Sequence, residues 1–234
     1  MAFDILKPEW GALRPIRGIL FDMDGLVLDT EKLFTRFWME ACRFYGFPMT
    51  KEQALGMRSL SSTAGQKQLG HYFGAEVNYA QIRSKRIELM SAFIEDNGVE
   101  PKPGIYELLD FLQSKGIATA ITSSSPTDRI QSYLMPLNLY HRFDRICSGH
   151  EVPKGKPEPD IYLHGAAVLG LRPEECLALE DSPAGILSAY RANCLPVIIP
   201  DQDNPSEETL TQCYAKADSL ADIIPLLNKT AGHP

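Results

Sequence analysis

The chain has 234 residues, of which 44% are hydrophobic and 23% charged, a composition typical of a globular protein with one large or two modest domains. Its net charge of −7 and the absence of a basic run argue against nucleic acid or an anionic membrane surface as a partner. Because it has neither an apolar run of 18 residues nor a signal-peptide pattern at the N-terminus, we expect a cytoplasmic protein. We also expect a monomer.

The first informative element follows residues 1–16, which we expect to form an N-terminal extension of unassigned role. The continuous apolar run Gly18–Phe21 predicts a buried strand of a parallel sheet. Asp22 and Asp24 come directly after it, and Gly25 permits a tight turn. Alternation along the strand sends both carboxylates toward the ligand-binding crevice at its carboxyl end. They would repel each other there unless a cation, most simply a divalent metal ion, shares the site; the alternative is a loop with two solvated acids.

The pattern becomes helical after Thr30. Apolar residues that recur at helical spacing from Leu33 to Tyr45 predict an amphipathic helix, which Gly46 ends. Residues 50–98 remain helical in character and contain no convincing strand. We therefore predict a bundle of about four helices over residues 32–100.

From Pro101 onward, short apolar runs alternate with helical stripes. Strands are expected at residues 117–121, 143–147, 176–179 and 195–199, and helices at 105–115, from 127, at 160–169, 184–192 and 220–227. This alternation predicts βαβ units and an α/β fold with a doubly wound parallel sheet, formed by residues 17–31 and 101–230. The helical bundle is then an insertion close to the two aspartates, which we interpret as a cap.

Three further polar clusters follow predicted strands: Thr122–Ser125, Lys154–Pro157 and Glu180–Asp181. Each alone has a structural interpretation, since serines form turns, loop lysines are usually solvated and acid pairs cap helices. Because parallel strands end at one edge of a sheet, however, all three converge with Asp22 and Asp24. Carboxylates that hold Mg²⁺, with a hydroxyl and a lysine that bind phosphate oxygens, suit phosphoryl transfer, in which a carboxylate can act as the nucleophile.

Four segments resemble the haloacid dehalogenase superfamily of phosphatases, in particular its β-phosphoglucomutase-like branch. They are Asp22-Met-Asp-Gly-Leu-Val-Leu-Asp-Thr30, Ser123 within Ile-Thr-Ser-Ser, Lys156 within Gly-Lys-Pro-Glu-Pro-Asp160, and Leu179-Glu-Asp-Ser-Pro-Ala-Gly-Ile186. They occur in the family's order, and the predicted helical block stands where the family has its cap.

The resemblance implies a role for each matching residue. Asp22 would be the nucleophile and a metal ligand, and Asp24 the general acid and base, with its backbone carbonyl on the metal. The residues implied for phosphate binding are Ser123, with Ser124 beside it, and Lys156. Glu180 and Asp181 would complete the magnesium site, and Arg58 lies where cap residues of this branch can meet the substrate.

The predicted function is therefore Mg²⁺-dependent hydrolysis of a small phosphorylated metabolite, such as a sugar phosphate, through an aspartyl-phosphate. The alternative within the family is a hexose-phosphate mutase. Mutases resembling this chain carry a histidine and a cap arginine where Phe34 and Ser59 stand, and both departures favour a hydrolase. A receiver-like signalling module is a distant alternative, because its acid pair precedes the nucleophile and its domain is about half as long.

Overall fold

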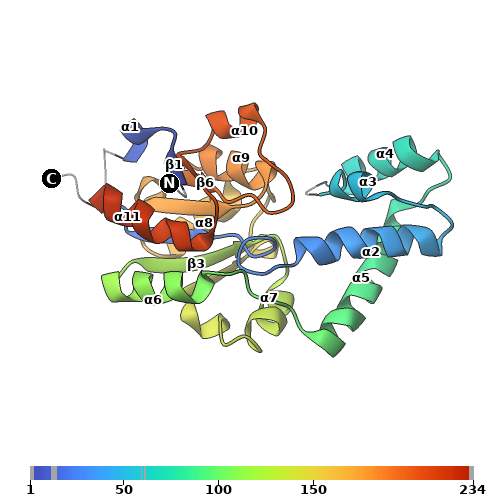
Figure 1. Cartoon of the computed structure of the whole chain (residues 1–234), viewed down its shortest axis with the longest axis horizontal. Coiled ribbons are helices and arrows are strands. Elements are labelled where there is room, and N and C mark those ends of the chain that lie inside the picture. Colours follow the sequence, from blue (N-terminus) through green and yellow to red (C-terminus); the bar gives the residue numbers. More distant parts are fainter. Residues whose placement is uncertain (1–2, 12–14, 59, 61, 232–234) are drawn as a thin grey trace. The chain divides into compact units, whose positions relative to one another are not determined.

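The computed structural model describes residues 3–11, 15–58, 60 and 62–231 (Figure 1). The chain folds into two compact units. One comprises the residues up to Leu28 and those from Pro101 onward, and the other comprises Asp29–Glu100. The first unit is an α/β structure and the second is entirely helical in its regular elements. The predicted α/β fold with a helical insertion is thus confirmed.

The α/β unit contains a seven-stranded sheet in the order β1-β7-β6-β5-β2-β3-β4. The strands are β1 (Phe3–Ile5), β2 (Gly18–Phe21), β3 (Ala118–Ser123), β4 (Arg145–Ser148), β5 (Cys176–Glu180), β6 (Leu195–Ile198) and β7 (Ala215–Ala217). All neighbours are parallel except β1, which pairs antiparallel with β7. Every residue of β2 is buried, as expected for a central strand of a parallel sheet covered on both faces.

Helices lie on both sides of this sheet: in Figure 1, α6 lies on one side of the strands and α9 on the other. The helices of the unit are α1 (Pro8–Gly11), α6 (Ile105–Lys115), α7 (Thr127–Leu134), α8 (Asp160–Val168), α9 (Pro183–Arg191), α10 (Glu207–Thr211) and α11 (Ile223–Ala231), with 3₁₀ turns at Tyr140–Arg142, Gly149–Glu151, Pro173–Glu175 and Leu220–Asp222. The apolar core between α8, α9 and the sheet includes Leu20, Ala120 and Ala178 from three neighbouring strands. This packing fixes the ends of β2, β3 and β5, where the polar clusters begin.

Local sequence signals explain several helix boundaries. Ser182 is the N-cap of α9: its side chain accepts a hydrogen bond from the backbone N–H of Gly185, and proline follows at N1. Helix α6 ends at Gly116, which has a φ of 65°, after Lys115 in the last turn. The sequence predicted these two helices at residues 105–115 and 184–192, within one residue of the observed bounds.

The helical unit consists of α2 (Glu31–Phe44), α3 (Lys51–Leu55), α4 (Ser62–Phe73) and α5 (Tyr79–Asn97). Its core is built around Trp38, Leu69, Tyr79 and Ile82. Among the helices in the described part of the chain, none has the length and apolar character needed to cross a membrane.

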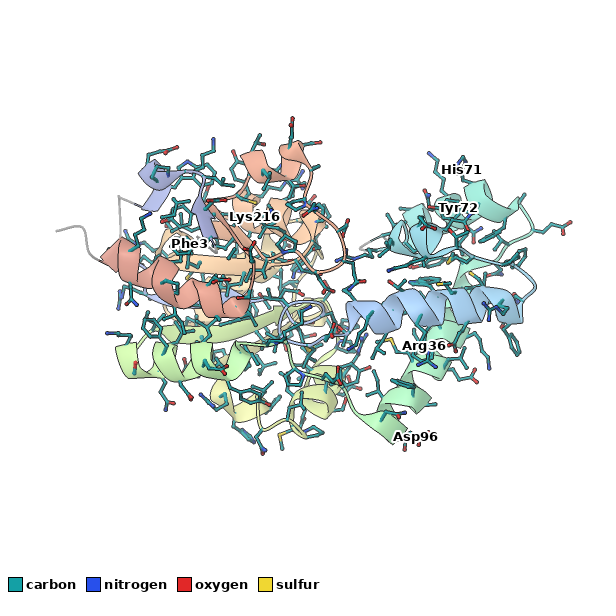
Figure 2. All side chains as sticks on the ribbon, in the orientation of Figure 1. Phe3, Arg36, His71, Tyr72, Asp96 and Lys216 are labelled. Carbon is teal, nitrogen blue, oxygen red and sulfur yellow. The ribbon has the colours of Figure 1, made fainter. Side chains whose placement is uncertain are left out.

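Two strands at one edge of the sheet were not predicted. Residues 3–5 belong to the stretch expected as an N-terminal extension without a role, yet they form β1 and pair with Ala215–Ala217 (β7). Figure 2 shows Phe3 and Lys216 on these strands. Both strands are three residues long and have a charged residue in the middle, so neither has the continuous apolar run that marks the central strands.

Candidate active site

The site lies at the carboxyl edge of the three central strands. Phe21 of β2 is in register with Ile121 of β3 on one side and with Leu179 of β5 on the other. The next residue along each strand is polar, so Asp22, Thr122 and Glu180 reach the edge at the same level. The backbone N–H of Asp22 continues the ladder by donating to the carbonyl oxygen of Leu179 at 3.0 Å. The convergence predicted for parallel strands is therefore present in the fold.

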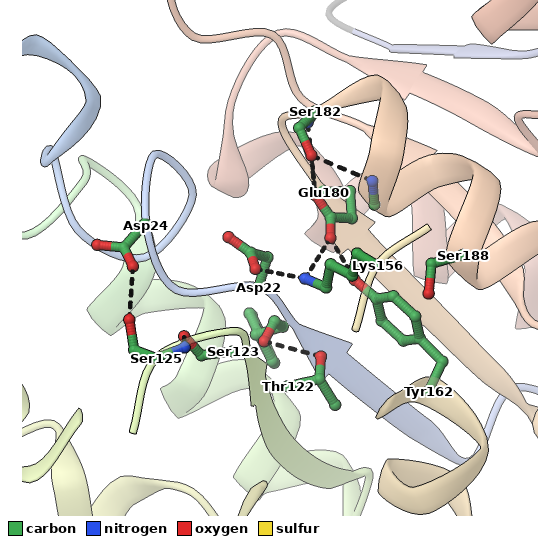
Figure 3. A network of polar contacts seen from close by, with 12 residues as sticks. Asp22, Asp24, Thr122, Ser123, Ser125, Lys156, Tyr162, Glu180, Ser182 and Ser188 are labelled. Atoms are coloured by element: carbon green, nitrogen blue, oxygen red, sulfur yellow. Dashed lines mark hydrogen bonds and ion pairs between the residues drawn. The ribbon is translucent and has the colours of Figure 1, made fainter. Parts of the chain in front are cut away.

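A buried ion triad forms the centre of the site (Figure 3). The Nζ of Lys156 lies 2.5 Å from Oδ1 of Asp22 and 2.6 Å from Oε1 of Glu180. The side chain of Glu180 is fully buried, and those of Lys156 and Asp22 are 9% and 12% exposed. Removing such charges from water is costly, so the triad is stable only because the lysine is shared by two carboxylates at hydrogen-bonding distance.

The surroundings shift the pKa values of Asp22 and Lys156 in this triad. Burial raises the pKa of Asp22 to about 8, and the charges of Glu180 and Asp24 act in the same direction while Lys156 opposes them. Burial works against the charge of Lys156, but the carboxylates of Asp22 and Glu180 outweigh it and raise the pKa of the ammonium above its ordinary value. The lysine therefore stays charged, while burial and the neighbouring acids disfavour the ionised form of Asp22.

Three carboxylates of this cluster form a candidate metal site. One oxygen each of Asp22, Glu180 and Asp181 lies within 4.8 Å of the other two, and all three residues are buried. Carboxylate oxygens are the ligands that Mg²⁺ prefers, and the single charge of Lys156 leaves room for a divalent cation in the charge balance. The donor set and its charge thus fit such an ion.

Glu180 is also held by hydrogen bonds to both of its carboxylate oxygens. Its Oε1 accepts hydrogen bonds from Lys156 and from the hydroxyl of Tyr162, the latter at 2.5 Å. Its Oε2 faces Oγ of Ser182 at 3.1 Å and the backbone nitrogen of the same residue at 3.4 Å. Since a carboxylate has about four acceptor positions, these donors fix the orientation of Glu180 closely.

Asp24 lies in the turn after β2, where Gly25 has a φ of 88°. Its Oδ2 accepts a hydrogen bond from Oγ of Ser125 at 3.2 Å (Figure 3). An Nη of Arg129 lies 3.5 Å from its Oδ1. Its carboxylate is not one of the three acids grouped above. The two aspartates of the motif thus have different partners.

The serine run after β3 is divided between buried and exposed positions. Ser123 and Ser125 are buried, and Oγ of Ser123 accepts a hydrogen bond from the backbone N–H of Ser125 at 3.1 Å. Ser124 is exposed between them. The sequence named Ser123 and Ser124 as candidates, but in this structure it is Ser125 that joins Ser123 in the polar network.

The remaining positions singled out in the sequence, Phe34, Arg58 and Ser59, belong to the helical unit. Within it, Nε of Arg58 lies 3.0 Å from Oε2 of Glu31, and both side chains are largely buried. The ring of Phe34 lies 4.8 Å from the guanidinium carbon of Arg86. Ser59 lies outside the described residues. A substrate-binding role for Arg58 stays a prediction.

Sequence reasoning missed Tyr162, Ser125 and Arg129 as members of the site. Ser125 belongs to a serine run that had been noticed, but the run gives no sign of which hydroxyl turns inward. Arg129 and Tyr162 lie in the first turns of α7 and α8, within segments that read as ordinary amphipathic helices. Their contribution depends on how each helix is rotated about its axis, which the packing against the sheet decides.

Comparison with known proteins agrees with this geometry. The family model of haloacid dehalogenase-like hydrolases matches residues 19–199. Hexitol phosphatase A of Escherichia coli (strain K12) is 34% identical over 184 residues, which cover 76% of this chain and 80% of that protein. A phosphorylated carbohydrates phosphatase of Thermotoga maritima is 29% identical over 177 residues, covering 76% of this chain and 82% of that protein.

A solved structure shares the fold. The crystal structure of a β-phosphoglucomutase from Clostridium difficile superposes with a TM-score of 0.74 at 22% identity, covering 93% of this chain and 100% of that one. The residues matched by the family model, 19–199, include all four segments that carry the candidate site. The chain therefore belongs to the haloacid dehalogenase-like hydrolases, in the branch of the hexitol phosphatases, and is a phosphatase of that family.

Proposed function

We propose that the protein is a magnesium-dependent phosphatase that hydrolyses a small phosphorylated metabolite through an aspartyl-phosphate on Asp22. The observation that carries this proposal is the buried contact of Lys156 with both Asp22 and Glu180 at the sheet edge, beside the carboxylate of Asp181. The names of two relatives, a hexitol phosphatase and a phosphorylated carbohydrates phosphatase, support a sugar or polyol phosphate as the substrate.

The proposed reaction has two steps. The carboxylate of Asp22 attacks phosphorus, so that a bond from its Oδ to phosphorus forms while the ester P–O bond breaks, and Asp24 gives a proton to the leaving oxygen. Water then attacks the aspartyl-phosphate, and Asp24 takes a proton from that water as inorganic phosphate leaves and Asp22 is restored. Atoms and charge balance over the two steps, which together consume one water.

Other side chains hold the phosphate while this happens. The ammonium of Lys156 is in place as a point charge for the phosphate oxygens, and the Ser123 hydroxyl, with Ser124 beside it, can donate hydrogen bonds to them. Asp22, Glu180 and Asp181, with the backbone carbonyl of Asp24, would hold Mg²⁺. When bound, this ion supplies the positive charge that favours ionised Asp22 and offsets the charge of the phosphate.

The test is phosphate release from a panel of monoesters in the presence of Mg²⁺. The panel should include hexitol phosphates, hexose and pentose phosphates, and pseudouridine 5′-phosphate, after the names of relatives. The proposal expects release from at least one of them by the wild-type protein and none by Asp22→Asn. Turnover by Asp22→Asn at the wild-type rate would contradict the aspartyl-phosphate.

The mutase alternative is decided by a second assay. A mutase must keep water from its aspartyl-phosphate while the sugar turns around, which requires polar groups to hold the second phosphate. Phe34 cannot donate a hydrogen bond at the position where such mutases carry a histidine. The assay supplies β-glucose 1-phosphate with a trace of glucose 1,6-bisphosphate. We expect free phosphate to form faster than glucose 6-phosphate. Faster formation of glucose 6-phosphate would identify a mutase.

A further inference from the structure

We propose that Tyr162 is a positioning residue that acts through Glu180 to hold the ammonium of Lys156 at the phosphate site. This inference rests on the proposed function, since it concerns the lysine that would bind the phosphate. It assigns a role to a side chain of α8 outside the four sequence segments that identified the site.

Tyr162 contacts both partners of the buried ion pair (Figure 3). Its hydroxyl lies 2.5 Å from Oε1 of Glu180, the same oxygen that lies 2.6 Å from Nζ of Lys156. The Nζ also lies 5.1 Å from the centre of the tyrosine ring, within the range of a cation–π contact. The tyrosine is fully buried, so its hydroxyl cannot exchange this partner for bulk water.

These contacts limit how the carboxylate of Glu180 can move. Ser182 donates to Oε2 on one side, while Tyr162 and Lys156 donate to Oε1 on the other. Lysine has a flexible four-carbon stem and no geometric preference of its own, so the position of its ammonium is set by the groups around it. The carboxylate of Glu180 is held by donors at both oxygens, and the ring of Tyr162 lies near the ammonium. Together they keep Nζ of Lys156 between Glu180 and Asp22.

The hydroxyl is the specific part of this arrangement. A phenylalanine would fill nearly the same volume and keep the ring contact, and packing alone therefore does not require the oxygen. Burying a hydroxyl is unfavourable unless it is hydrogen-bonded, and this one is bonded to the acid that also binds the site lysine. Without the hydroxyl, Oε1 would have one donor fewer, and Glu180 and Lys156 could shift together.

The decisive comparison is between Tyr162→Phe and Tyr214→Phe. Tyr214 is also buried in the same unit but lies directly before β7, where its backbone bonds to Leu6 and Pro196. We expect Tyr162→Phe to lower kcat/KM and to weaken the binding of inorganic phosphate in the presence of Mg²⁺, measured by calorimetry, each by about tenfold, as for a lost hydrogen bond to a charged group. Tyr214→Phe should leave both quantities within about twofold of wild type, a change too small to indicate a lost contact.

A double variant separates positioning from a loss of stability. If the hydroxyl acts through Glu180, adding Tyr162→Phe to Glu180→Leu, which removes the acceptor, should weaken phosphate binding by less than about twofold further, because contacting residues are not additive. The proposal is overturned if Tyr162→Phe retains wild-type kinetics and phosphate affinity, or if its loss of phosphate affinity is equally large in the Glu180→Leu background. A wild-type protein that releases no phosphate from any monoester would instead contradict the proposed function, and the phosphate affinities would still test the positioning role.

Discussion

The α-carbon of Gly185 and the carboxylate of Glu180 are so close that no side chain fits between them. A Cβ added at Gly185 would lie 1.9 Å from Oε1 of Glu180, far inside van der Waals contact. The first turn of α9 therefore packs directly against the acid that binds Lys156. The same serine that caps this turn, Ser182, also donates to Glu180, so the helix start and the acid form one local structure.

Gly185→Ala should displace Glu180 and impair the site. The added methyl group forces the carboxylate away from Tyr162 and Lys156, and we expect at least about tenfold lower kcat/KM with a lower melting temperature, as for overpacking of a tight core. Gly70→Ala in α4 is the matched control, because a Cβ there has nothing within 4 Å. That variant should be stabilised by up to about 1 kcal/mol, the difference in helix propensity. Equal behaviour of the two variants would contradict the steric argument.

Lys156→Met should destabilise the fold as well as abolish activity. It leaves the carboxylates of Asp22 and Glu180 buried without their cation, and breaking a buried pair on one side costs about 3–5 kcal/mol. Urea unfolding in the absence of Mg²⁺ measures this. The control is Arg142→Met, which breaks the surface pair with Asp110 (2.6 Å) and should cost no more than about 1 kcal/mol. An unchanged urea midpoint for Lys156→Met would mean that the triad contributes little to stability.

Asp24→Asn should slow turnover without unfolding the protein. Asparagine can still accept the hydrogen bond that Ser125 donates to Oδ2. The contact with Arg129 is lost, but such a long, partly exposed ion pair contributes no more than about 1 kcal/mol. It cannot donate and recover a proton, and we expect kcat to fall by about 10²–10⁴-fold, the usual weight of general acid–base catalysis. Steady-state phosphate release together with a thermal melt checks both parts; a kcat close to wild type would remove Asp24 from the acid–base role.

Mg²⁺ should stabilise the folded protein, and EDTA should reverse the effect and stop hydrolysis. A ligand that binds only the native state at 100 times its dissociation constant adds about 2.7 kcal/mol, which a thermal melt detects readily. Asp181→Asn removes a carboxylate from the candidate metal site and should reduce the Mg²⁺-induced shift. A shift of equal size in wild type and Asp181→Asn would place the ion elsewhere.

The lowered pKa of Glu175 should make the stability of the fold depend on pH, through contacts that lie outside the candidate active site. Hydrogen bonds from the side chain and backbone N–H of Arg172 lower the pKa of Glu175 to about 2, below the value of about 4.5 expected in the unfolded chain. The ionised form is thus favoured in the folded state. Its contribution is complete above about pH 4.5 and is lost as the pH falls from there toward 2.

The corresponding experiment compares melting temperatures of wild type and Glu175→Gln over this range. The deficit of the variant should be largest near neutral pH and should shrink as the pH falls below about 4.5. A deficit that stays constant down to the lowest pH at which both proteins fold would show that the charge of Glu175 is not responsible.

The central strands and the residues that follow them could be predicted from the sequence. Gly18–Phe21 is a continuous apolar run, and such a run suits only a position buried on both faces of a sheet. Because strand ends converge in a parallel sheet, Asp22, Lys156 and Glu180 could be expected together before any contact was known. Their hydrogen bonds in the structure agree with that expectation.

Other features could not be predicted, because they depend on the orientation of a side chain or on the place of a strand in the sheet. Local sequence patterns specify neither. Ser124 and Ser125 are chemically identical neighbours, and only the path of the chain after β3 exposes one and turns the other toward Asp24. Tyr162 resembles any apolar residue of an amphipathic helix until α8 is docked. The strands β1 and β7 were missed because three-residue strands carry too little hydrophobic periodicity to stand out.

The pairing of β1 with β7 has a consequence for how the chain assembles. Phe3 and Ala217 are partners in the sheet although they come from opposite ends of the described chain. During synthesis, β1 emerges first and has no strand to pair with until β7, the last strand, has followed it. Closing so long a loop makes this a contact of high sequence separation, which favours late formation. The central strands can thus assemble earlier, and the docking of the N-terminal strand marks the completion of the sheet.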